Sequence, residues 1–385
     1  MNLLIVRTSG SYLDYKTYNC QELGLAKALT EKKIKVSIIM AGHKEENISL
    51  KCPKGNIDIH YLKFKGMNQQ ISIFFKWKVC IKKINPDIIQ IHDLGIYMTY
   101  LVAKWAKNHK IPCVQIQGNY ELTQKPIFHQ LEQLYNYTLG KITLNNINAV
   151  GYKTRKAESY IKRYNNKITT FPTPIGLDPS QFIPTNLTHN WIKELNLFNK
   201  KILLYIGSLE KRRNPDFLIK VLNKLPNDYV LLIAGNGPME NDIRKDIVQL
   251  KLQNRCFLLG KLKQNELSSL YQISTMFLLA SNYEIYGMVI MEAMFFGVPV
   301  ISTLTAGSES LIENNINGHI IEDLDENTWA KTIYGTTENS QKLNDMRRSA
   351  TNKIKNELLW DIVSNKFIVL YEYAINQHKK VFNHD

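Results

Sequence analysis

The sequence predicts an α/β protein made of two Rossmann-like halves, each with a parallel sheet. Apolar runs of strand length alternate with helix-length amphipathic segments along the chain, and this alternation favours parallel sheets that bind ligands at the carboxyl ends of their strands. A Pro- and Gly-rich stretch, residues 171–179, separates the halves. With 385 residues, the chain is long enough for two domains that each bury a core.

The first half is expected to begin with a buried strand and to continue through alternating helices and strands. Helices are expected over residues 19–31 and 96–107, because each shows a helical apolar period. The expected strands are residues 3–6, 36–40, 57–61, 88–91 and 113–116. Gly10 lies in the first strand-to-helix loop, and His92 follows the fourth strand. Each is a candidate ligand contact. A plain turn glycine explains Gly10 equally well, and the structural role is the favoured one for His92.

The second half repeats the pattern. Strands are expected at residues 202–206, 230–234, 256–259, 276–279 and 300–301. A last helix, about residues 360–377, is expected to cross back and pack on the first domain. The predicted domains are therefore residues 1–172 with 360–385, and residues 173–359.

The stretch from residue 284 to 299 carries the strongest functional signal. It follows an apolar strand at residues 275–280 and contains a helix predicted over 288–296, closed by Gly297 and Pro299. The first backbone N–H groups of that helix, at Gly287, Met288 and Val289, lack partners within the helix and lie at its positive end. They form a seat for an anion such as a diphosphate.

Two carboxylates flank this seat, Glu284 before it and Glu292 within the helix, eight positions apart. They could hold hydroxyl groups on either side of a bound phosphate, which suits a nucleotide sugar. The alternative is that Glu284 serves the helix dipole and Glu292 faces solvent. The surroundings of Glu292 are almost wholly apolar, however, so its carboxylate is expected to be paired or to face a ligand.

With its neighbours, this segment resembles the donor site of retaining glycosyltransferases of family 4, which have the GT-B fold and a Glu-x7-Glu motif. The similarity extends over the C-terminal half, and the matching stretches come in the family's order: residues 204–213, 231–238, 258–262, 297–301, Gly307 and 311–318. The resemblance implies two Rossmann-like domains with parallel sheets that face an interdomain cleft. It also implies an acceptor-binding N-terminal domain and a donor-binding C-terminal domain.

The resemblance assigns roles within the donor site. Glu284 and Arg213 would be catalytic. The donor-binding residues would be Gly10, Ser208, Arg212, Lys261, Leu262, Gly287, Met288, Val289 and Glu292. Ser208 stands where the family commonly has Arg, and Arg213 stands where it has Lys, so a bidentate guanidinium would replace a point charge.

The N-terminal half supplies weaker candidates. Gln117 occupies the position of a family His, so it can hydrogen-bond a sugar but cannot take a proton. Gln117 and His92 are the acceptor-side candidates. No metal is expected to be needed, because Asp323 and Asp325, the only Asp-x-Asp pair, fit a loop and a helix start better than a metal site.

The charge is strongly asymmetric. Residues 1–170 carry 26 Lys and Arg against 11 Asp and Glu, whereas the remainder balances at 23 of each, so the net charge of +15 lies entirely in the first half. The N-terminal domain is therefore expected to meet an anionic partner: a phospholipid surface, a phosphate-bearing acceptor or nucleic acid. Because the N-terminal domain handles the acceptor in the resembled fold, the resemblance implies a lipid-diphosphate-linked glycan at a membrane surface. Residues 74–84 form a Lys-rich amphipathic pattern that either faces a membrane or packs on the domain's own sheet.

Several classes of function are disfavoured. The five cysteines are scattered and form no CxxC pair, so neither a disulfide framework nor a zinc site is indicated. No nucleic-acid motif appears, and Gly235-Asn-Gly237-Pro lacks the third glycine of a dinucleotide fingerprint. No secretory leader or membrane-spanning run is evident, which predicts a cytoplasmic protein held peripherally at the inner face of the membrane.

The expected activity is transfer of a hexose, with retention of configuration, from a nucleoside-diphosphate sugar to a lipid-linked or polysaccharide acceptor in cell-envelope glycan synthesis. A UDP-sugar is the expected donor, without a further cofactor. Two alternatives stay open at this point: a GT-B nucleotide-sugar epimerase or hydrolase, and a non-catalytic basic glycan-binding protein.

Overall fold

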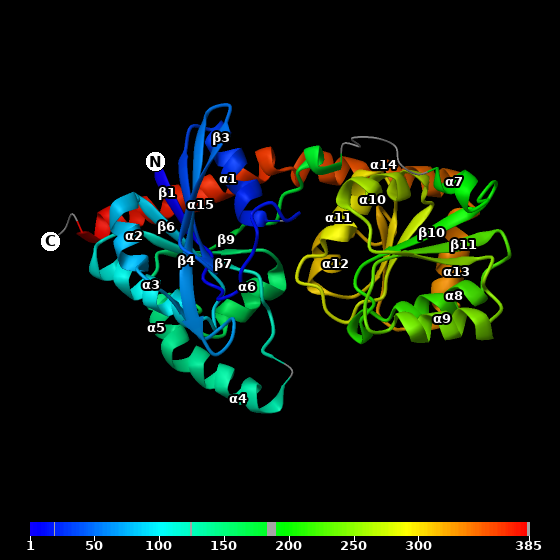
Figure 1. The fold of residues 1–385 in the computed structure, drawn as a ribbon, viewed down its shortest axis with the longest axis horizontal. Coiled ribbons are helices and arrows are strands. Elements are labelled where there is room, and N and C mark those ends of the chain that lie inside the picture. The colour runs from blue at the N-terminus through cyan, green and yellow to red at the C-terminus, as the bar shows by residue number, and fades with distance from the viewer. Residues whose placement is uncertain (19, 124, 183–189, 383–385) are drawn as a thin grey trace. The chain divides into compact units, whose positions relative to one another are not determined.

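The chain folds into two compact α/β units, as the sequence predicts. A computed structural model describes residues 1–18, 20–123, 125–182 and 190–382. Unit 1 comprises Met1–Gly176 and the C-terminal segment from Trp360, and unit 2 is Leu177–Leu359 (Figure 1). By sequence, unit 1 has 29 Lys and Arg against 14 Asp and Glu, and unit 2 has 20 of each. The whole positive excess therefore belongs to unit 1.

Unit 1 is built on a mostly parallel sheet with the strand order β3-β4-β2-β1-β6-β7-β8-β9. The central strand β1 (Asn2–Val6) pairs in parallel with β2 (Lys35–Gly42) and β6 (Ile88–His92). Beyond β6 follow β7 (Cys113–Gln117), β8 (Ala149–Tyr152) and β9 (Thr170–Pro172). Four successive residues of β1, from Leu3 to Val6, are at most 1% exposed, so the middle of this sheet is the core of the unit.

The other edge of the sheet contains antiparallel strands that the sequence did not reveal. The long strand β4 (Gly55–Gly66) runs parallel to β2, but β3 (Glu46–Cys52) and β5 (Ser72–Phe74) pair with it in the antiparallel direction. The burial of β3 alternates between exposed and half-buried. This is the pattern of an edge strand, and it gives only a weak apolar signal.

The helices of unit 1 connect these strands. They are α1 (Gln21–Glu31), α2 (Trp77–Ile84), α3 (Tyr97–Asn108), α4 (Pro126–Tyr135), the π-helical turn η1 (Asn136–Gly140), α5 (Lys141–Asn145) and α6 (Arg155–Lys162). In α2 the expected apolar stripe packs on the unit's own structure, because Trp77 and Ile81 are buried together with Phe74 of β5. This segment therefore takes the packing alternative and not a membrane-facing one.

The last helix, α15 (Trp360–Phe382), returns to unit 1 as expected and packs against α1, β7, β8 and β9. Glycines make room for its first side chain: an added Cβ would lie 2.3 Å from Trp360 Nε1 at Gly24 and 2.4 Å from its Cδ2 at Gly176. The indole is thus held between α1 and the segment that leaves β9. Further along, Tyr371 donates a hydrogen bond to Gln90 of β6.

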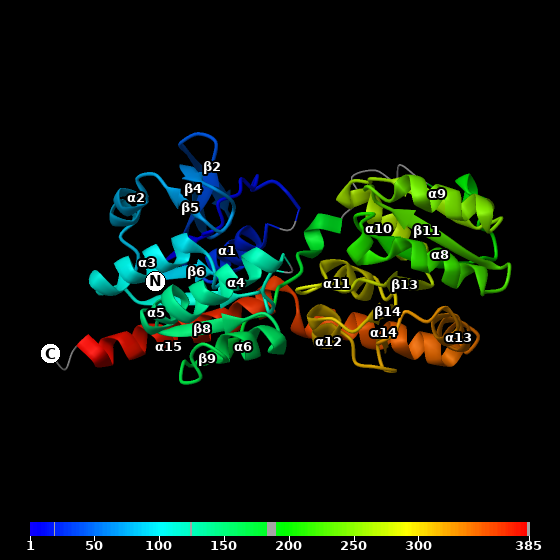
Figure 2. The ribbon, with the colours of Figure 1, turned by 90° about the horizontal axis from the view of Figure 1, so that it is seen from below.

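Unit 2 contains a parallel sheet with the strand order β12-β11-β10-β13-β14-β15. Its strands are β10 (Lys201–Ile206), β11 (Tyr229–Ala234), β12 (Cys256–Gly260), β13 (Met276–Leu279), β14 (Val300–Thr303) and β15 (Gly318–Ile321). Figure 2 shows helices on both sides of these strands. The first five strands lie where the sequence places them, and β15 is an addition.

The helical elements of unit 2 are η2 (Pro179–Phe182), α7 (Trp191–Glu194), η3 (Lys211–Arg213), α8 (Pro215–Asn223), α9 (Glu240–Gln249), α10 (Gln264–Ile273), α11 (Met288–Phe295), α12 (Ala306–Leu311), α13 (Glu326–Thr337) and α14 (Ser340–Glu357). Asp325 accepts a hydrogen bond from Thr328 N at 2.7 Å and caps α13, as expected from its place at a helix start. This bond and others to Thr328 lower the pKa of Asp325.

Two helical glycines should respond in opposite ways to the same substitution. A Cβ at Gly335 in α13 meets no atom within 4 Å, so Gly335→Ala should raise the free energy of unfolding by about 0.5–1 kcal/mol through lower chain entropy. Gly24→Ala should lower it by about 1–3 kcal/mol, because the methyl group collides with Trp360. Urea denaturation of both variants checks this. Equal stabilisation by both would contradict the packing of α15 on α1.

Lowering the pH should reduce the free energy of unfolding of unit 2, because it protonates His319 in β15. Its ring is 4% exposed and Nε2 lies 2.9 Å from Thr336 Oγ1. Burial, aided by the charge of Lys342, lowers the pKa of His319 to about 4 from an ordinary value of 6.5. The unfolded chain therefore binds a proton at His319 more readily than the folded chain does. The contribution of neutral His319 to the free energy of unfolding is complete above pH 6.5 and is lost as the pH falls towards 4.

The expected loss from His319 between pH 7.5 and pH 5 is about 2 kcal/mol of unfolding free energy. His319→Asn should remove that part of the pH dependence in denaturation curves, whereas the same substitution at the exposed His129 should leave it unchanged. An identical pH dependence for the wild type and His319→Asn would exclude His319 as the source.

Candidate active site

Predicted donor residues from two loops lie at one edge of the sheet of unit 2, whereas the predicted donor contact Gly10 belongs to unit 1. The basic loop (residues 207–214) follows β10, and the acidic loop (residues 281–287) begins shortly after β13. Strands β10 and β13 are parallel neighbours, with Leu204 opposite Phe277. Their carboxyl ends therefore lie at the same edge of the sheet, where ligands bind in open α/β folds.

Arg213 and Glu284 form an ion pair between these two loops. Arg213 Nη1 lies 2.9 Å from a carboxylate oxygen of Glu284, and the two side chains are only 16% and 11% exposed. Arg213 Nε is buried and donates no hydrogen bond within the described residues. The sequence placed both residues in one site, and the structure joins them directly.

Asn214 joins the two loops through its side chain. Its amide nitrogen donates to Ala280 O and to Asn282 Oδ1, both at 2.8 Å, and Asn282 N donates to Arg212 O at 2.8 Å. Asn214 has a φ of +46°, a left-handed conformation that Asn tolerates better than most residues. It ends η3 and begins α8 at the point where the chain turns.

The neighbouring cations have different surroundings. Arg212 is exposed and pairs with Glu210 at 3.0 Å, while its Nη1 donates to Tyr283 O at 3.2 Å. Lys211 is also exposed. Arg213, which is largely buried, is therefore the cation of this loop that points into the site.

Close backbone contacts hold the basic loop. A Cβ at Gly235 would lie 1.9 Å from Gly207 O, and one at Gly207 would lie 3.1 Å from Arg213 Nη1. Tyr205 OH donates to Ser208 O at 2.8 Å. Ser208 therefore contributes its backbone to the shape of the loop, in a place where the side chain of Arg is common in the resembled family.

Helix α11 begins at the expected glycine. Gly287 precedes Met288 with a φ of +77°, and its carbonyl oxygen accepts from Ile290 N at 2.9 Å. The first-turn N–H groups at Met288 and Val289 lie at the positive end of the helix dipole, beside the Glu284 loop. Gly307 of α12 supports this loop, because its N–H donates to Glu284 O at 3.2 Å.

Glu292 lies inside unit 2 and is hydrogen-bonded. It is 2% exposed, and its Oε2 accepts from Tyr271 OH at 2.9 Å and from Gln264 Nε2 at 3.3 Å. The sequence predicted that this carboxylate would be paired or face a ligand, but it gave no sign of the partners. Both partners belong to α10, which follows Lys261 and Leu262, so the predicted nucleobase loop and Glu292 are connected through this helix.

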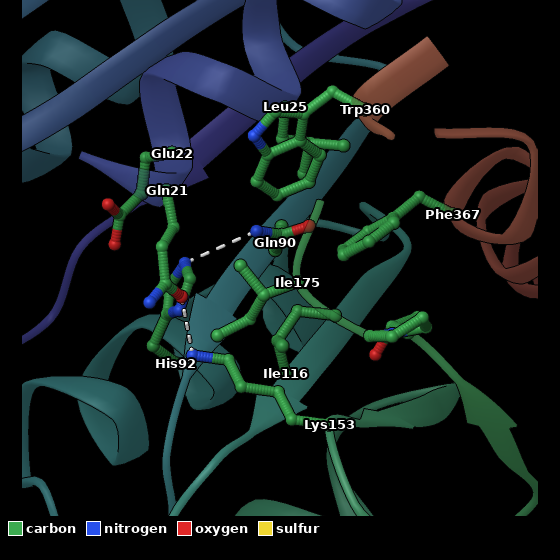
Figure 3. Close-up of a pocket in the computed structure, with 12 residues that line it drawn as sticks. Gln21, Glu22, Leu25, Gln90, His92, Ile116, Lys153, Ile175, Trp360 and Phe367 are labelled. Carbon is green, nitrogen blue, oxygen red and sulfur yellow. Dashed lines mark hydrogen bonds between the residues drawn. The ribbon is translucent and has the colours of Figure 1, made fainter. Parts of the chain in front are cut away.

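In unit 1, His92 lies at the carboxyl end of β6 in a small pocket. Gln21, Glu22 and Lys153 line the same pocket (Figure 3). His92 Nε2 lies 3.2 Å from Gln90 Nε2, and Lys153 Nζ donates to Gln21 at 2.8 Å. Burial lowers the pKa of His92 although the charge of Glu22 opposes the shift.

Glu22 completes this cluster. Burial opposes its ionisation, but the charges of His92 and Arg7 outweigh burial and lower the pKa of Glu22. Arg7 Nε lies 3.8 Å from Glu22 Oε1. The pocket thus combines buried charges of both signs with apolar walls from Leu25, Ile116, Ile175, Trp360 and Phe367. Sequence analysis missed Glu22 and Lys153 because they are far apart in the chain.

Gln117 is fully buried at the end of β7. Its Oε1 accepts from Leu94 N at 2.8 Å and from Gln115 Nε2 at 2.9 Å, and its Nε2 donates to Asn119 O at 2.7 Å. The amide therefore holds two loops at the sheet edge. Its contact with an acceptor stays a prediction, and this structure shows a positioning role.

Gly10 is explained by close packing. An added Cβ would lie 2.1 Å from Ser72 Oγ, and Gly10 N donates to Gln69 O at 2.9 Å. The glycine thus lets the loop after β1 approach the segment between β4 and β5. Its contact with a donor diphosphate stays a prediction.

A larger polar pocket of about 690 Å³ lies among the loops of unit 1. Its lining includes Arg7, Asp93, Asn119, Lys125 and Phe128. Asp93 has a φ of +44°, and its carboxylate accepts from Gly118 N at 2.7 Å and Asn119 N at 3.2 Å. Among the described residues, no group of three or more His, Cys, Asp and Glu side chains could hold a metal ion.

The chain is similar in sequence to known glycosyltransferases. Residues 188–353 match the family model described as glycosyl transferases group 1. The chain is 28% identical over 305 residues to a UDP-Gal:alpha-D-GlcNAc-diphosphoundecaprenol alpha-1,3-galactosyltransferase from Escherichia coli, covering 76% of each chain. It is 23% identical over 310 residues to a 2-deoxystreptamine N-acetyl-D-glucosaminyltransferase from Niallia circulans, covering 77% of this chain and 79% of that one.

Solved structures share the fold. A sucrose-phosphate synthase from Thermosynechococcus elongatus superposes with a TM-score of 0.75 at 16% identity, covering 96% of this chain and 98% of that one. HepE from Anabaena, solved in complex with UDP, gives 0.74 at 16% identity, with 97% and 100% covered. The solved structures show that the fold is GT-B, and the family model with the named relatives shows that the chain is a glycosyltransferase enzyme.

Proposed function

We propose that this enzyme is a retaining glycosyltransferase of family 4 that moves a hexose from a UDP-sugar to a lipid-linked or polysaccharide acceptor in cell-envelope glycan synthesis. The observation that carries the proposal is the Arg213–Glu284 ion pair beside the start of α11. It sets a cation, a carboxylate and a row of backbone N–H groups at one sheet edge. A nucleotide sugar offers a diphosphate and hydroxyl groups to these three kinds of partner.

The roles follow from the chemistry of each group. Arg213 has a buried N–H without a hydrogen-bond partner in the described residues, so it can bind the diphosphate as negative charge develops on it. Glu284 accepts hydrogen bonds from hydroxyls of the hexose. Glu292, oriented by Tyr271 and Gln264, accepts from the ribose hydroxyls.

The remaining residues of the donor site make lesser contributions. Met288 and Val289 contribute backbone N–H groups to the diphosphate seat that opens at Gly287. Arg212 adds positive charge at the rim, and Ser208 adds the backbone of the basic loop. Lys261 and Leu262 border the nucleobase. Together these groups supply the positive field, so we propose that transfer requires no metal.

The reaction keeps the configuration of the sugar. The acceptor oxygen forms a bond to the anomeric carbon on the face from which the diphosphate oxygen departs. The acceptor proton passes to that leaving oxygen, which gives UDP and the glycosylated acceptor. This route needs no protein base, which fits the presence of Gln117 where the resembled family has an ionisable residue. Arg213 and the α11 amides stabilise the departing charge.

The acceptor side is assigned to unit 1 because of its charge and its polar pockets. The E. coli relative bears a name with a diphosphoundecaprenol-linked acceptor, and the basic excess of unit 1 suits such an anionic lipid. We propose peripheral attachment of unit 1 to the cytoplasmic face of the membrane. None of the helices in the described ranges is long and apolar enough to cross a membrane.

Replacing Glu284 by Gln should separate binding from catalysis. The substitution keeps the shape of the side chain but removes its charge, so sugar transfer should fall by at least about 100-fold. UDP binding, measured by calorimetry, should change by less than about threefold, since Arg213 and the α11 amides remain. Glu322→Gln, at an exposed site of unit 2, is the matched control. Near-normal transfer by Glu284→Gln would refute the donor-site assignment.

Product analysis with and without acceptor belongs to the same experiment. A transferase yields a glycosylated acceptor, whereas an epimerase or hydrolase consumes the nucleotide sugar at the same rate in its absence.

Removing one hydroxyl should reveal the role of Glu292. Tyr271→Phe keeps the ring that stacks on Phe296 but deletes the O–H that holds Glu292. UDP should bind about three- to tenfold more weakly, because a freed carboxylate orients the ribose less well. Tyr334→Phe, on the exposed surface of α13, should bind UDP as the wild type does. Unchanged UDP binding by Tyr271→Phe would contradict the proposed contact between Glu292 and the ribose.

A further inference from the structure

Unit 1 carries a helical segment whose outer side is apolar and exposed. Elements α4, η1 and α5 follow one another without a break from Pro126 to Asn145. None of the residues of α4 is buried. Four large aliphatic side chains on this segment are between 45% and 75% exposed: Ile127, Leu131, Leu134 and Ile142. We call these four residues the outer stripe.

The spacing of the outer stripe follows the helix. Steps of four, three and eight residues keep its members on one side. Buried Asn136, Gly140 and Thr143 occupy the opposite side, where Asn136 Nδ2 donates to Tyr160 OH at 2.8 Å. The segment is thus anchored by one face and presents the other to solvent. An exposed apolar run of this kind marks an interaction surface.

Few charged residues lie beside the outer stripe: one acidic residue is half-buried, and one lysine is exposed. Glu132, the only Asp or Glu from 126 to 145, is half-buried and accepts from Thr123 N at 2.9 Å. Burial raises the pKa of Glu132. On the exposed side, Lys141 lies over the ring of Tyr137, with Nζ 5.1 Å from the ring centroid. Apolar side chains with a flanking lysine, on a unit with an excess of 15 positive charges, complement an anionic bilayer.

Other occupants fit less well. A second copy of the chain would bring two strongly basic units together, and their like charges repel. The alternative membrane segment, α2, uses its apolar stripe inside unit 1. Its outer side retains one exposed apolar residue within the helix, Val79, among lysines, and Phe75 is exposed just before the helix.

We propose that the α4–η1–α5 segment is the membrane-docking element of this enzyme, with the outer stripe inserted among the lipid chains of an anionic bilayer. The inference rests on the proposed function, since a lipid-linked acceptor gives docking its purpose. Phe128 and Lys125, at the start of the segment, also line the large polar pocket of unit 1. Docking therefore brings that pocket to the level of the lipid head groups, within reach of an acceptor held in the membrane.

The test is co-sedimentation of the full chain with lipid vesicles. Vesicles of phosphatidylglycerol and phosphatidylcholine should bind the wild type, and binding should weaken when salt rises from about 0.05 M to 0.5 M. Pure phosphatidylcholine should bind it less. The double variant L131Q/L134Q should lower the partition coefficient by at least about tenfold, because two exposed apolar anchors are lost.

Two comparisons keep the outcome unambiguous. Val79→Gln, which removes an equally exposed apolar residue from α2, should bind vesicles as the wild type does. All variants should bind UDP with unchanged affinity, so failure of docking is distinguishable from failure of the donor site. Wild-type binding by L131Q/L134Q, or no binding of the wild type to anionic vesicles, would overturn the proposal. So would a dimer in analytical ultracentrifugation that L131Q/L134Q dissociates.

Discussion

The candidate active site depends on the ion pair between Arg213 and Glu284. Each residue comes from a loop at the end of a different parallel strand, so the pair exists only if β10 and β13 are neighbours. Asn214 and its hydrogen bonds to Ala280 and Asn282 keep the loops in register. A partly buried charge pair is costly unless further polar groups support it. In the proposed function, the diphosphate of the donor would be such a group for Arg213.

Charged groups also lie close together at the sheet edge of unit 1. There Glu22 and Lys153 meet His92 in a pocket with apolar walls, and Arg7 Nε lies 3.8 Å from Glu22 Oε1. Opposite charges offset the cost of burying each ion, and Gln117 ties the adjacent loops by three hydrogen bonds. The loops at this sheet edge are therefore held together by hydrogen bonds and by opposite charges.

Much of the donor side could be predicted from sequence because its signals are local. Gly287 marks the start of a helix, and Glu284 and Glu292 flank it within one short stretch. Tyr271 and Gln264 could not be found this way. They reach Glu292 from α10, and ordinary core residues give the same pattern in sequence. The outer stripe of α4 also escaped notice, since an apolar helical period normally indicates burial and only the fold shows that the stripe has no cover within its unit.

The sequence alone determined the order of the central parallel strands, the division of charge between the two halves and the residue types at the start of α11. All of these are properties of composition or of short-range periodicity. The tertiary structure decided which side chains meet: Arg213 with Glu284, Glu292 with Tyr271, and Trp360 with Gly24. Such pairings depend on which strands become neighbours and on how closely two backbones approach. The spacing of residues along the chain specifies neither the strand neighbours nor the distance between backbones.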